Sequence, residues 1–164
     1  MSEQAIKKIL ITGANGFIGG SLMRYYQNQD QDVVGVDLVG NGDDIVEGDI
    51  SQPDTISQQL QECDVIIHTA ALVSNAMQDS DMWRVNVLAT RNLIQAAKEH
   101  KVRRFVQISS IVAYGNTAEG ELNETHPVHA DGGSYVLTKL ASEHVVLSEQ
   151  TNDCLLYTSD AADD

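Results

Sequence analysis

The stretch KILITGANGFIG, residues 8–19, joins a short apolar run to three closely spaced glycines. The run is typical of a buried strand, and a helical spacing of apolar residues follows it through about Gln29. Gly13, Gly16 and Gly19 stand between the two, where glycine permits a tight turn and lets backbone amides approach a phosphate group. The order strand, glycine turn, helix predicts the first unit of a parallel α/β sheet, with the phosphates of a dinucleotide at the helix N-terminus.

The rest of the chain repeats this alternation of strands and helices as far as about residue 150. Further strands are predicted at residues 32–37, 44–50, 64–70 and 102–110, and helices at 53–61, 79–100 and 134–150, the last capped by Ser134. Residues 114–133 are polar and predict a long loop. Because crossovers between parallel strands are right-handed, the expected strand order is 3-2-1-4-5, in a Rossmann-type doubly wound α/β fold.

The helix predicted at 79–100 carries one apolar stripe. Its members are spaced by three or four residues: Met82, Val85, Ala89, Leu93 and Ala96. Such a stripe predicts a regular α-helix that buries one face against the sheet.

Asp37 ends the second predicted strand, 18 residues after Gly19. At this place in a dinucleotide-binding fold a carboxylate accepts hydrogen bonds from a ribose 2′-hydroxyl, whereas it would repel a 2′-phosphate. No Lys or Arg occurs between Arg24 and Arg84 to offset that repulsion. The sequence therefore predicts NAD rather than NADP as the cofactor.

A second group of polar residues has the pattern of an acid/base site. Tyr135 and Lys139 are four residues apart and so share one face of the predicted helix. A nearby ammonium stabilises a phenolate, which allows such a pair to exchange a proton with a substrate hydroxyl or carbonyl. This spacing alone is common on exposed helices. Ser110, however, follows the fifth strand at the edge where parallel sheets bind ligands, and we expect its hydroxyl to orient the substrate oxygen.

The order of these motifs resembles that of the extended short-chain dehydrogenase/reductases, in particular the NAD-dependent epimerase/dehydratase family. The matching segments, in chain order, are TGANGFIG at 12–19, Asp37, Asp49-Ile50, HTAA at 68–71, Val85-Asn86-Val87 leading to Thr90, SSIVAYG at 109–115 and YVLTK at 135–139. Together they span nearly all of residues 7–150. Ala113 stands where the family commonly has Val, which is a mild departure.

The resemblance implies a role for each matching residue. Besides the glycines and Asp37, Phe17 and Ile18 would lie along the pyrophosphate of the cofactor, and Asp49 and Ile50 would hold its adenine. Thr69, Ala70 and Ala71 would line the cofactor, and Asn86 would lie near its nicotinamide. Ser110, Tyr135 and Lys139 would be the catalytic residues, and the last two would also hold the cofactor. Ser110 is preferred to Ser109 because it lies four residues before Tyr114, as in the family's SSxxVYG pattern.

The resemblance also implies the reaction, which is hydride transfer to and from a nicotinamide cofactor by an oxidoreductase or isomerase. A nucleotide-sugar epimerase or dehydratase is the first expectation, because nucleotide sugars are the family's commonest substrates. Val73 stands where epimerases resembling the galactose enzyme carry a Lys, which weakens that particular assignment. The segment HTAALVS, residues 68–74, also resembles hydroxysteroid- and dihydroflavonol-type dehydrogenases and reductases. A non-catalytic NAD-binding module is a third alternative, against which the intact Ser, Tyr and Lys argue.

The amino-acid composition excludes some classes of binding partner for this protein. A net charge of −14 opposes binding to nucleic acid or to an anionic membrane, which leaves a small-molecule substrate, with a homodimer of the full-length form as an open alternative. No stretch approaches the roughly 18 apolar residues of a membrane helix, and no apolar signal core precedes the first strand, so we expect a cytoplasmic protein. Cys63 and Cys154 form no CxxC pair, and His126 and His129 have no evident third ligand, so no metal site is predicted.

Residues 154–164, CLLYTSDAADD, share no pattern with what precedes them. Residues 154–163 can be back-translated as TGT CTC TTA TAC ACA TCT GAC GCT GCC GAC. This nucleotide sequence resembles the transposon-end adapter of sequencing libraries, read in frame. The alternative is a natural acidic loop. We therefore expect an incomplete Rossmann domain at 1–153, an adapter artefact at 154–164, and a natural protein that continues into further strands and a substrate domain. The fifth strand would then be an unpaired edge.

Overall fold

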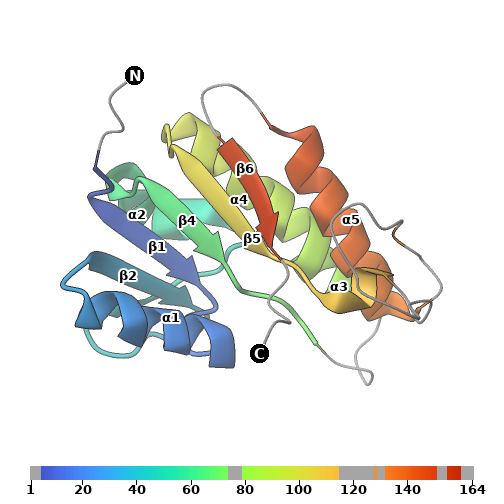
Figure 1. Cartoon of the computed structure of the whole chain (residues 1–164), viewed down its shortest axis with the longest axis horizontal. Helices are drawn as coiled ribbons and strands as arrows, with labels where there is room; N and C mark the ends of the chain where they lie inside the picture. Colours follow the sequence, from blue (N-terminus) through green and yellow to red (C-terminus); the bar gives the residue numbers. More distant parts are fainter. Residues whose placement is uncertain (1–4, 74–78, 115–127, 129–131, 151–154, 160–164) are drawn as a thin grey trace.

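The computed structural model describes the chain outside residues 1–4, 74–78, 115–127, 129–131, 151–154 and 160–164 (Figure 1). At the centre of the described part is a six-stranded parallel sheet in the order β3-β2-β1-β4-β5-β6. The strands are β1 (Lys8–Thr12), β2 (Asp32–Asp37), β3 (Ile45–Glu47), β4 (Val65–His68), β5 (Arg104–Ile108) and β6 (Leu155–Ser159). The first five have the predicted order, which confirms the Rossmann-type fold. Most of the loop predicted at 114–133, with His126 and His129, lies outside the described residues.

β6 changes the expected edge of the sheet. It runs parallel to β5, from Arg104 paired with Leu155 to Ile108 paired with Ser159. The prediction that the fifth strand lacks a partner is therefore wrong. Residues 154–164 resemble an adapter in sequence, but strand pairing uses main-chain groups, which a segment of nearly any origin supplies.

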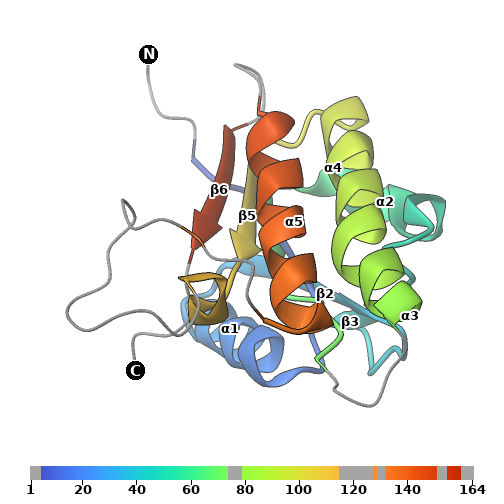
Figure 2. The same ribbon diagram turned by 90° about the vertical axis from the view of Figure 1, so that its right-hand side faces the viewer.

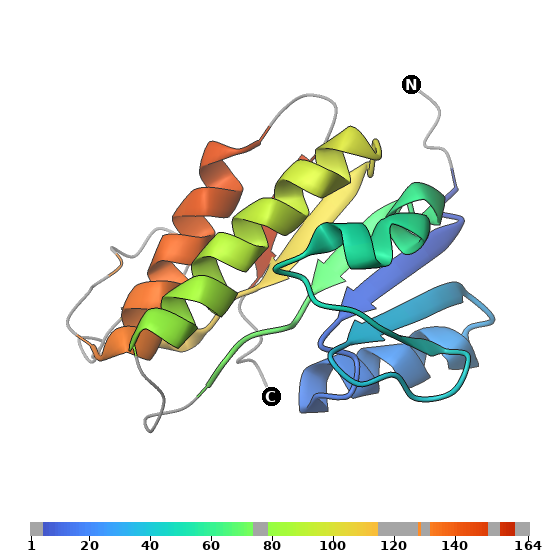
Figure 3. The same ribbon diagram turned by 180° about the vertical axis from the view of Figure 1, so that it is seen from behind.

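Helices cover both faces of the sheet (Figures 2 and 3). On one face α1 (Phe17–Asn28) packs on β1 and β2. The layer on the other face contains α2 (Ser57–Glu62), α4 (Thr90–Glu99) and α5 (Ser134–Ser148), with a short 3-10 turn before α2 (η1, Pro53–Ile56). Another 3-10 turn, η3 (Ile111–Tyr114), follows β5 and contacts α5.

The predicted cap of α5 is wrong by one residue. Gly133 is the N-cap, no side chain caps the helix by a hydrogen bond, and Ser134 is already its first helical residue. In the part of the chain that the structure describes, no helix is both long and apolar enough to cross a membrane.

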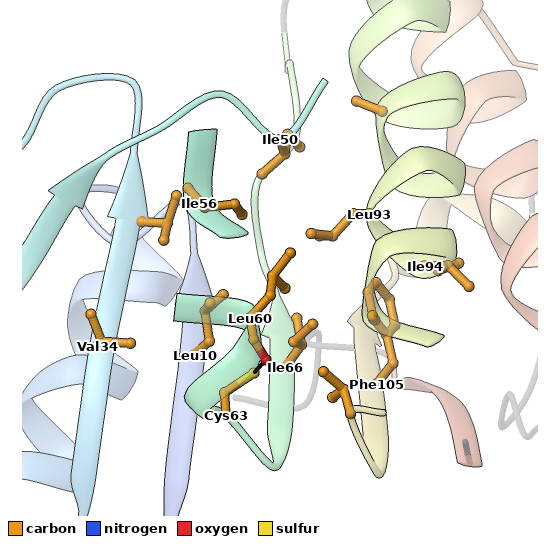
Figure 4. Packing of buried hydrophobic residues seen from close by; sticks show 14 of the residues in the cluster. Leu10, Val34, Ile50, Ile56, Leu60, Cys63, Ile66, Leu93, Ile94 and Phe105 are labelled. Atoms are coloured by element: carbon orange, nitrogen blue, oxygen red, sulfur yellow. Dashed lines mark hydrogen bonds between the residues drawn. The ribbon is translucent and has the colours of Figure 1, made fainter. Parts of the chain in front are cut away.

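The larger core cluster lies between the sheet and the layer of α2, α4 and α5. Figure 4 shows Leu93 of α4 pointing toward the strands that carry Ile66 and Phe105, whereas Ile94 lies on the side of α4 toward α5. All four side chains are fully buried. Burial of this kind contributes roughly 1.5–3 kcal/mol per large apolar side chain. A smaller cluster, which includes Met23 of α1, lies on the opposite face. β1 and β4 are thus held between two layers, and the loops that follow them start from fixed points.

The long helix predicted at 79–100 contains a π-helical segment. α3 (Asp79–Trp83) passes into a π-helix (η2, Arg84–Ala89) and then into α4. Of the predicted stripe, Met82, Ala89 and Leu93 are buried, whereas Val85 and Ala96 are only partly buried. A π turn contains an extra residue and so shifts the face that the helix buries. The polar side chain of Asn86, four residues after Met82 and three before Ala89, is also buried on this side of the helix.

Candidate functional site

A cleft of about 750 Å³ lies at the carboxyl ends of strands β1 to β4, a size suited to a bound small molecule. Its lining includes eight of the predicted cofactor-binding residues: Gly13, Gly16, Asp37, Asp49, Ile50, Thr69, Ala70 and Ala71. The lining also includes side chains that the motifs did not single out, among them Asn15, Leu38, Leu72, Asp81 and Arg84. Part of the sequence-derived cofactor site therefore lines this cleft, at the edge where open parallel sheets bind ligands.

Asp81 and Arg84 are two cleft residues that the sequence could not distinguish from ordinary surface charges. They form an ion pair at 3.5 Å on the helix that follows β4, and both are well exposed to solvent. Opposite charges three residues apart are typical of any solvated helix face. Only the position of this helix turn at the cleft distinguishes the two residues from other surface charges.

The glycine loop is packed too tightly to accept side chains. Gly13 has a φ of +69°, and a Cβ at this residue would lie 2.8 Å from the backbone N and Cα of Ala70. A Cβ on Gly19 would collide with the carbonyl oxygen of Gly13. The turn therefore presents backbone to the cleft, directly before the N-terminus of α1. This arrangement fits a pyrophosphate, because backbone amides and the helix dipole both favour negative charge there.

Asp37 lies at the end of β2 and joins that strand to the glycine loop. Its Oδ2 accepts a hydrogen bond from the amide of Asn15 at 2.9 Å, and its Oδ1 accepts one from the amide of Leu38 at 2.8 Å. An ionised carboxylate has about four acceptor positions. The two backbone contacts thus orient the carboxylate and still leave acceptor positions for the hydroxyls of a ribose.

Asp49 and Ile50 follow β3 and line the same cleft. Burial tends to raise the pKa of Asp49, but hydrogen bonds from Ser51 and Gln52 and the positive charge of Arg84 lower it below its usual value. The Ser51 amide donates to the Asp49 carboxylate at 2.8 Å. Asp49 is therefore a negatively charged acceptor at neutral pH, beside the apolar side chain of Ile50.

Some predicted cofactor residues do not line the cleft. Phe17 is 91% exposed, Ile18 also lies on the surface at the start of α1, and Gly19 is buried beneath the loop. Asn86 is buried, and its side chain bonds both backbone groups of Leu72, accepting from the amide at 2.7 Å and donating to the carbonyl at 3.0 Å. Asn86 therefore shapes the cleft through the chain that follows β4.

The three predicted catalytic residues lie on α5 and just after β5. Lys139 is only 4% exposed, and its Nζ donates to the carbonyl oxygen of Ile108, the last residue of β5, at 2.7 Å. Ser110 follows two residues later, half-buried, and leads into η3, which packs on α5. Tyr135 is also half-buried and lies one helical turn before Lys139. The bond from Lys139 thus holds α5 to the strand that carries Ser110.

The structure also distinguishes Ser110 from its neighbour. Ser109 is buried, and its hydroxyl donates to the carboxylate of Glu143 on α5. The Ser109 hydroxyl is therefore engaged in holding α5 against the end of β5, which favours Ser110 as the serine that meets a substrate. Glu143 was missed by the sequence analysis, although it lies four residues after Lys139 and so on the same side of the helix.

Comparisons with known proteins agree with this geometry. A model of the NAD dependent epimerase/dehydratase family matches residues 9–158. The low-salt glycan biosynthesis protein Agl12 of Haloferax volcanii is 31% identical over 164 residues, covering 88% of this chain and 53% of the relative. Sterol demethylase protein B of Methylococcus capsulatus is 34% identical over 155 residues, covering 85% of this chain and 46% of the relative. The chain thus spans about half the length of the curated relatives it matches.

A solved structure of MoeE5 in complex with UDP-glucose and NAD has a TM-score of 0.82 to this chain at 31% identity, covering 93% of this chain and 52% of that one. NAD is the cofactor of the matching family. The family model spans most of the chain, including the glycine loop, Asp37 and the whole of α5. The chain therefore belongs to the NAD-dependent epimerase/dehydratase family.

Proposed function

We propose that the full-length protein is an NAD-dependent epimerase/dehydratase-type oxidoreductase that acts on a nucleotide sugar. The observation that carries this proposal is the bond from Lys139 to Ile108, which brings α5, with Tyr135, to the end of the strand that leads to Ser110. Two similar proteins support the substrate class, one named for glycan biosynthesis and one solved with UDP-glucose and NAD.

Each residue of the site takes a separate part in the proposed reaction. The phenol of Tyr135 exchanges a proton with the substrate hydroxyl or carbonyl. The ammonium of Lys139, held in place by β5, stabilises the phenolate and binds the ribose of the cofactor. The hydroxyl of Ser110 bonds the substrate oxygen and orients the reacting carbon. NAD, when bound, accepts a hydride from that carbon or returns it.

A second candidate is a dehydrogenase or reductase for a hydroxysteroid- or dihydroflavonol-like substrate. It is favoured by two exposed apolar side chains, Val73 after β4 and Ile111 after β5, which stand at the carboxyl edge of the sheet. Apolar side chains at this edge suit an apolar substrate better than a diphosphate. The similarity to the sterol demethylase protein supports the same alternative.

Turnover by the full-length enzyme separates these candidates. Purified enzyme with NAD is supplied with a panel of nucleoside-diphosphate sugars and with a panel of hydroxysteroids and dihydroflavonols, and the products are separated by chromatography. Conversion of a nucleotide sugar supports the first candidate, and conversion of an apolar alcohol supports the second. Tight NAD binding without turnover of either panel would favour a non-catalytic NAD-binding module.

The role of Tyr135 is tested with the same assay. We expect Tyr135→Phe to reduce turnover by at least about 10²-fold with NAD affinity nearly unchanged, because general acid/base catalysis contributes roughly 10²- to 10⁴-fold. Tyr26→Phe is the matched control, since Tyr26 lies on α1 among the apolar residues of the opposite face. Near-native turnover by Tyr135→Phe would overturn the assignment.

A further inference from the structure

A chain of buried hydrogen bonds connects the glycine loop to α5, and His68 lies at its centre. His68 is the last residue of β4 and is only 2% exposed. Its Nδ1 is 2.7 Å from the hydroxyl of Thr12, the residue before Gly13. Its Nε2 is 2.9 Å from the hydroxyl of Thr90 at the start of α4. Both threonines are fully buried, so no water competes for these contacts.

The partners of Thr90 determine which ring nitrogen carries the proton. The Thr90 hydroxyl donates its single hydrogen to the carbonyl oxygen of Asn86 at 2.9 Å. It can therefore only accept from His68, so Nε2 is the protonated nitrogen. Nδ1 is then an acceptor and receives the hydrogen of Thr12, whose oxygen in turn accepts the amide of Ala70 at 3.4 Å. Every donor in this chain has one acceptor, and the ring is neutral.

Asn86 carries the chain of bonds onward to α5. Its Nδ2 donates to the hydroxyl of Thr138 at 3.1 Å, besides its bond to Leu72. The Thr138 hydroxyl donates to the carbonyl oxygen of Tyr135 at 2.9 Å. Thr138 is the residue before Lys139, so this contact reaches the helical turn that carries both proposed acid/base residues.

We propose that His68 is a positioning residue, which fixes the glycine loop at the end of β1 against the π-helical turn and, through Asn86, against the first turns of α5. The two halves of the site lie on segments that are far apart in the sequence, and the ring of His68 bonds one residue of β1 and one of α4. The inference rests on the proposed function in one respect, namely that α5 carries the acid/base residues. The role of His68 in fixing the glycine loop depends only on NAD binding, and not on the proposed reaction.

The protonation pattern of the ring can be measured without any substrate. In full-length protein with ¹⁵N-labelled histidine, we expect NMR to show His68 as a neutral imidazole protonated at Nε2, and to show no titration of this ring between about pH 7 and pH 5. Comparison with a His68→Asn variant assigns the signals. A ring protonated at Nδ1, or one that titrates near its ordinary pKa of about 6.5, would overturn the proposal.

Two variants test the two halves of the connection. His68→Leu removes both ring contacts and is expected to weaken NAD binding by at least about tenfold, because Thr12 before the glycine loop loses its acceptor. Thr90→Val removes the acceptor of Nε2 while Thr12 keeps its own, and is expected to lower kcat by at least about tenfold with a smaller change in NAD affinity. If His68 had a purely structural role, both variants would lower the melting temperature, and NAD affinity and kcat would not be affected separately in this way.

Ile66→Val is the matched control. Ile66 lies two residues before His68, on the same face of β4, and is fully buried. The loss of one methylene there costs about 0.5–1.5 kcal/mol and touches none of these hydrogen bonds. If His68→Leu and Thr90→Val lose no more NAD affinity or kcat than Ile66→Val, His68 is not a positioning residue. If the wild-type enzyme converts no substrate, the proposed function fails, and the NMR and NAD-binding results still decide the role of His68.

Discussion

Asp37 is held by the amides of Asn15 and Leu38, so its carboxylate has a fixed direction before any ligand arrives. Preorganisation of this kind removes the entropy loss that a mobile acceptor would suffer on binding. We propose that it also places negative charge where NADP would carry its 2′-phosphate. On this proposal, Asp37 is the residue that discriminates between the two cofactors.

We predict that the full-length protein binds NAD at least about tenfold more tightly than NADP, a difference of about 1.4 kcal/mol. Asp37→Asn should reduce the preference because it removes the charge. Asp32→Asn is the control, since Asp32 is an exposed residue at the opposite end of β2. Calorimetric titration with each cofactor measures the ratio, and equal affinities in the wild type would contradict the role given to Asp37.

His68 also makes the stability of the protein depend on pH. Burial, and to a lesser degree the charge of Lys139, lowers the pKa of His68 to about 3. A histidine in the unfolded chain has a pKa of about 6.5. Below that pH the unfolded state binds a proton that the folded state does not. Stability is therefore greatest above about pH 6.5 and falls as the pH falls toward about 3.

We predict that, between about pH 6.5 and pH 5, the free energy of unfolding falls more steeply in wild type than in His68→Leu, by up to about 1.4 kcal/mol per pH unit. Most carboxylates titrate below this window, so they contribute little to the difference. Urea unfolding of the full-length protein at several pH values gives the two slopes. Parallel slopes would show that His68 takes up a proton in the folded state.

At the scale of elements, α4 is held by two kinds of contact. Leu93 and Ile94 on its buried side belong to the larger core cluster, and near its end Lys98 donates to the carboxylate of Glu149, just after α5, at 2.6 Å. The Lys98 and Glu149 side chains are each about one quarter exposed. Partly solvated ion pairs contribute little, whereas buried apolar side chains contribute several kcal/mol.

We predict that Leu93→Ala lowers the free energy of unfolding by about 2–5 kcal/mol, whereas Glu149→Gln lowers it by at most about 1 kcal/mol. Salt should reduce the second effect and leave the first unchanged, because screening acts on the ion pair alone. Urea unfolding at low and high ionic strength provides both tests. A larger loss from Glu149→Gln would mean that the ion pair is the principal link between α4 and α5.

The π-helix shows why the buried face of a helix is harder to predict than the helix itself. The apolar residues between 79 and 100 follow a regular α-helical spacing, so the sequence indicated one straight stripe. In the structure a π-helix interrupts this helix at Arg84–Ala89, and Asn86 lies on the buried side, where Leu72 and Thr138 satisfy its amide. These partners lie 14 and 52 residues away in the sequence, and a spacing rule within one helix contains no information about them.

For the whole molecule, the origin of residues 154–164 decides which sequence belongs to the protein. We propose that this segment is an in-frame adapter. The family match extends to residue 158, and β6 pairs with β5 in a parallel ladder of main-chain groups. A segment of foreign origin can make the same main-chain bonds, because an exposed strand edge accepts almost any extended chain. The sequence of the source gene beyond codon 153 therefore tests the proposal directly.

We predict that the 164-residue chain binds NAD weakly and turns over no substrate, because it spans only about half the length of its curated relatives. A chain ending at residue 153 should associate more strongly, because β5 then loses its partner. A chain extended from re-sequenced DNA should be soluble and active. Size-exclusion chromatography and NAD titration of the three chains measure this. A source gene that encodes CLLYTSDAADD and a stop, with a monomeric and active product, contradicts both the adapter and the prediction of inactivity.

The sequence by itself determined the strand order, the glycine loop and the positions of Asp37, Tyr135 and Lys139. These follow from local causes, namely apolar periodicity, the steric freedom of glycine and a spacing of four residues on one helix. Only the tertiary structure decided that Asp37 fastens the glycine loop, that Asn86 points inward, and that His68 joins β1 to α4. Each of these depends on hydrogen bonds between groups far apart along the chain, which become neighbours only when the sheet and its helices have packed.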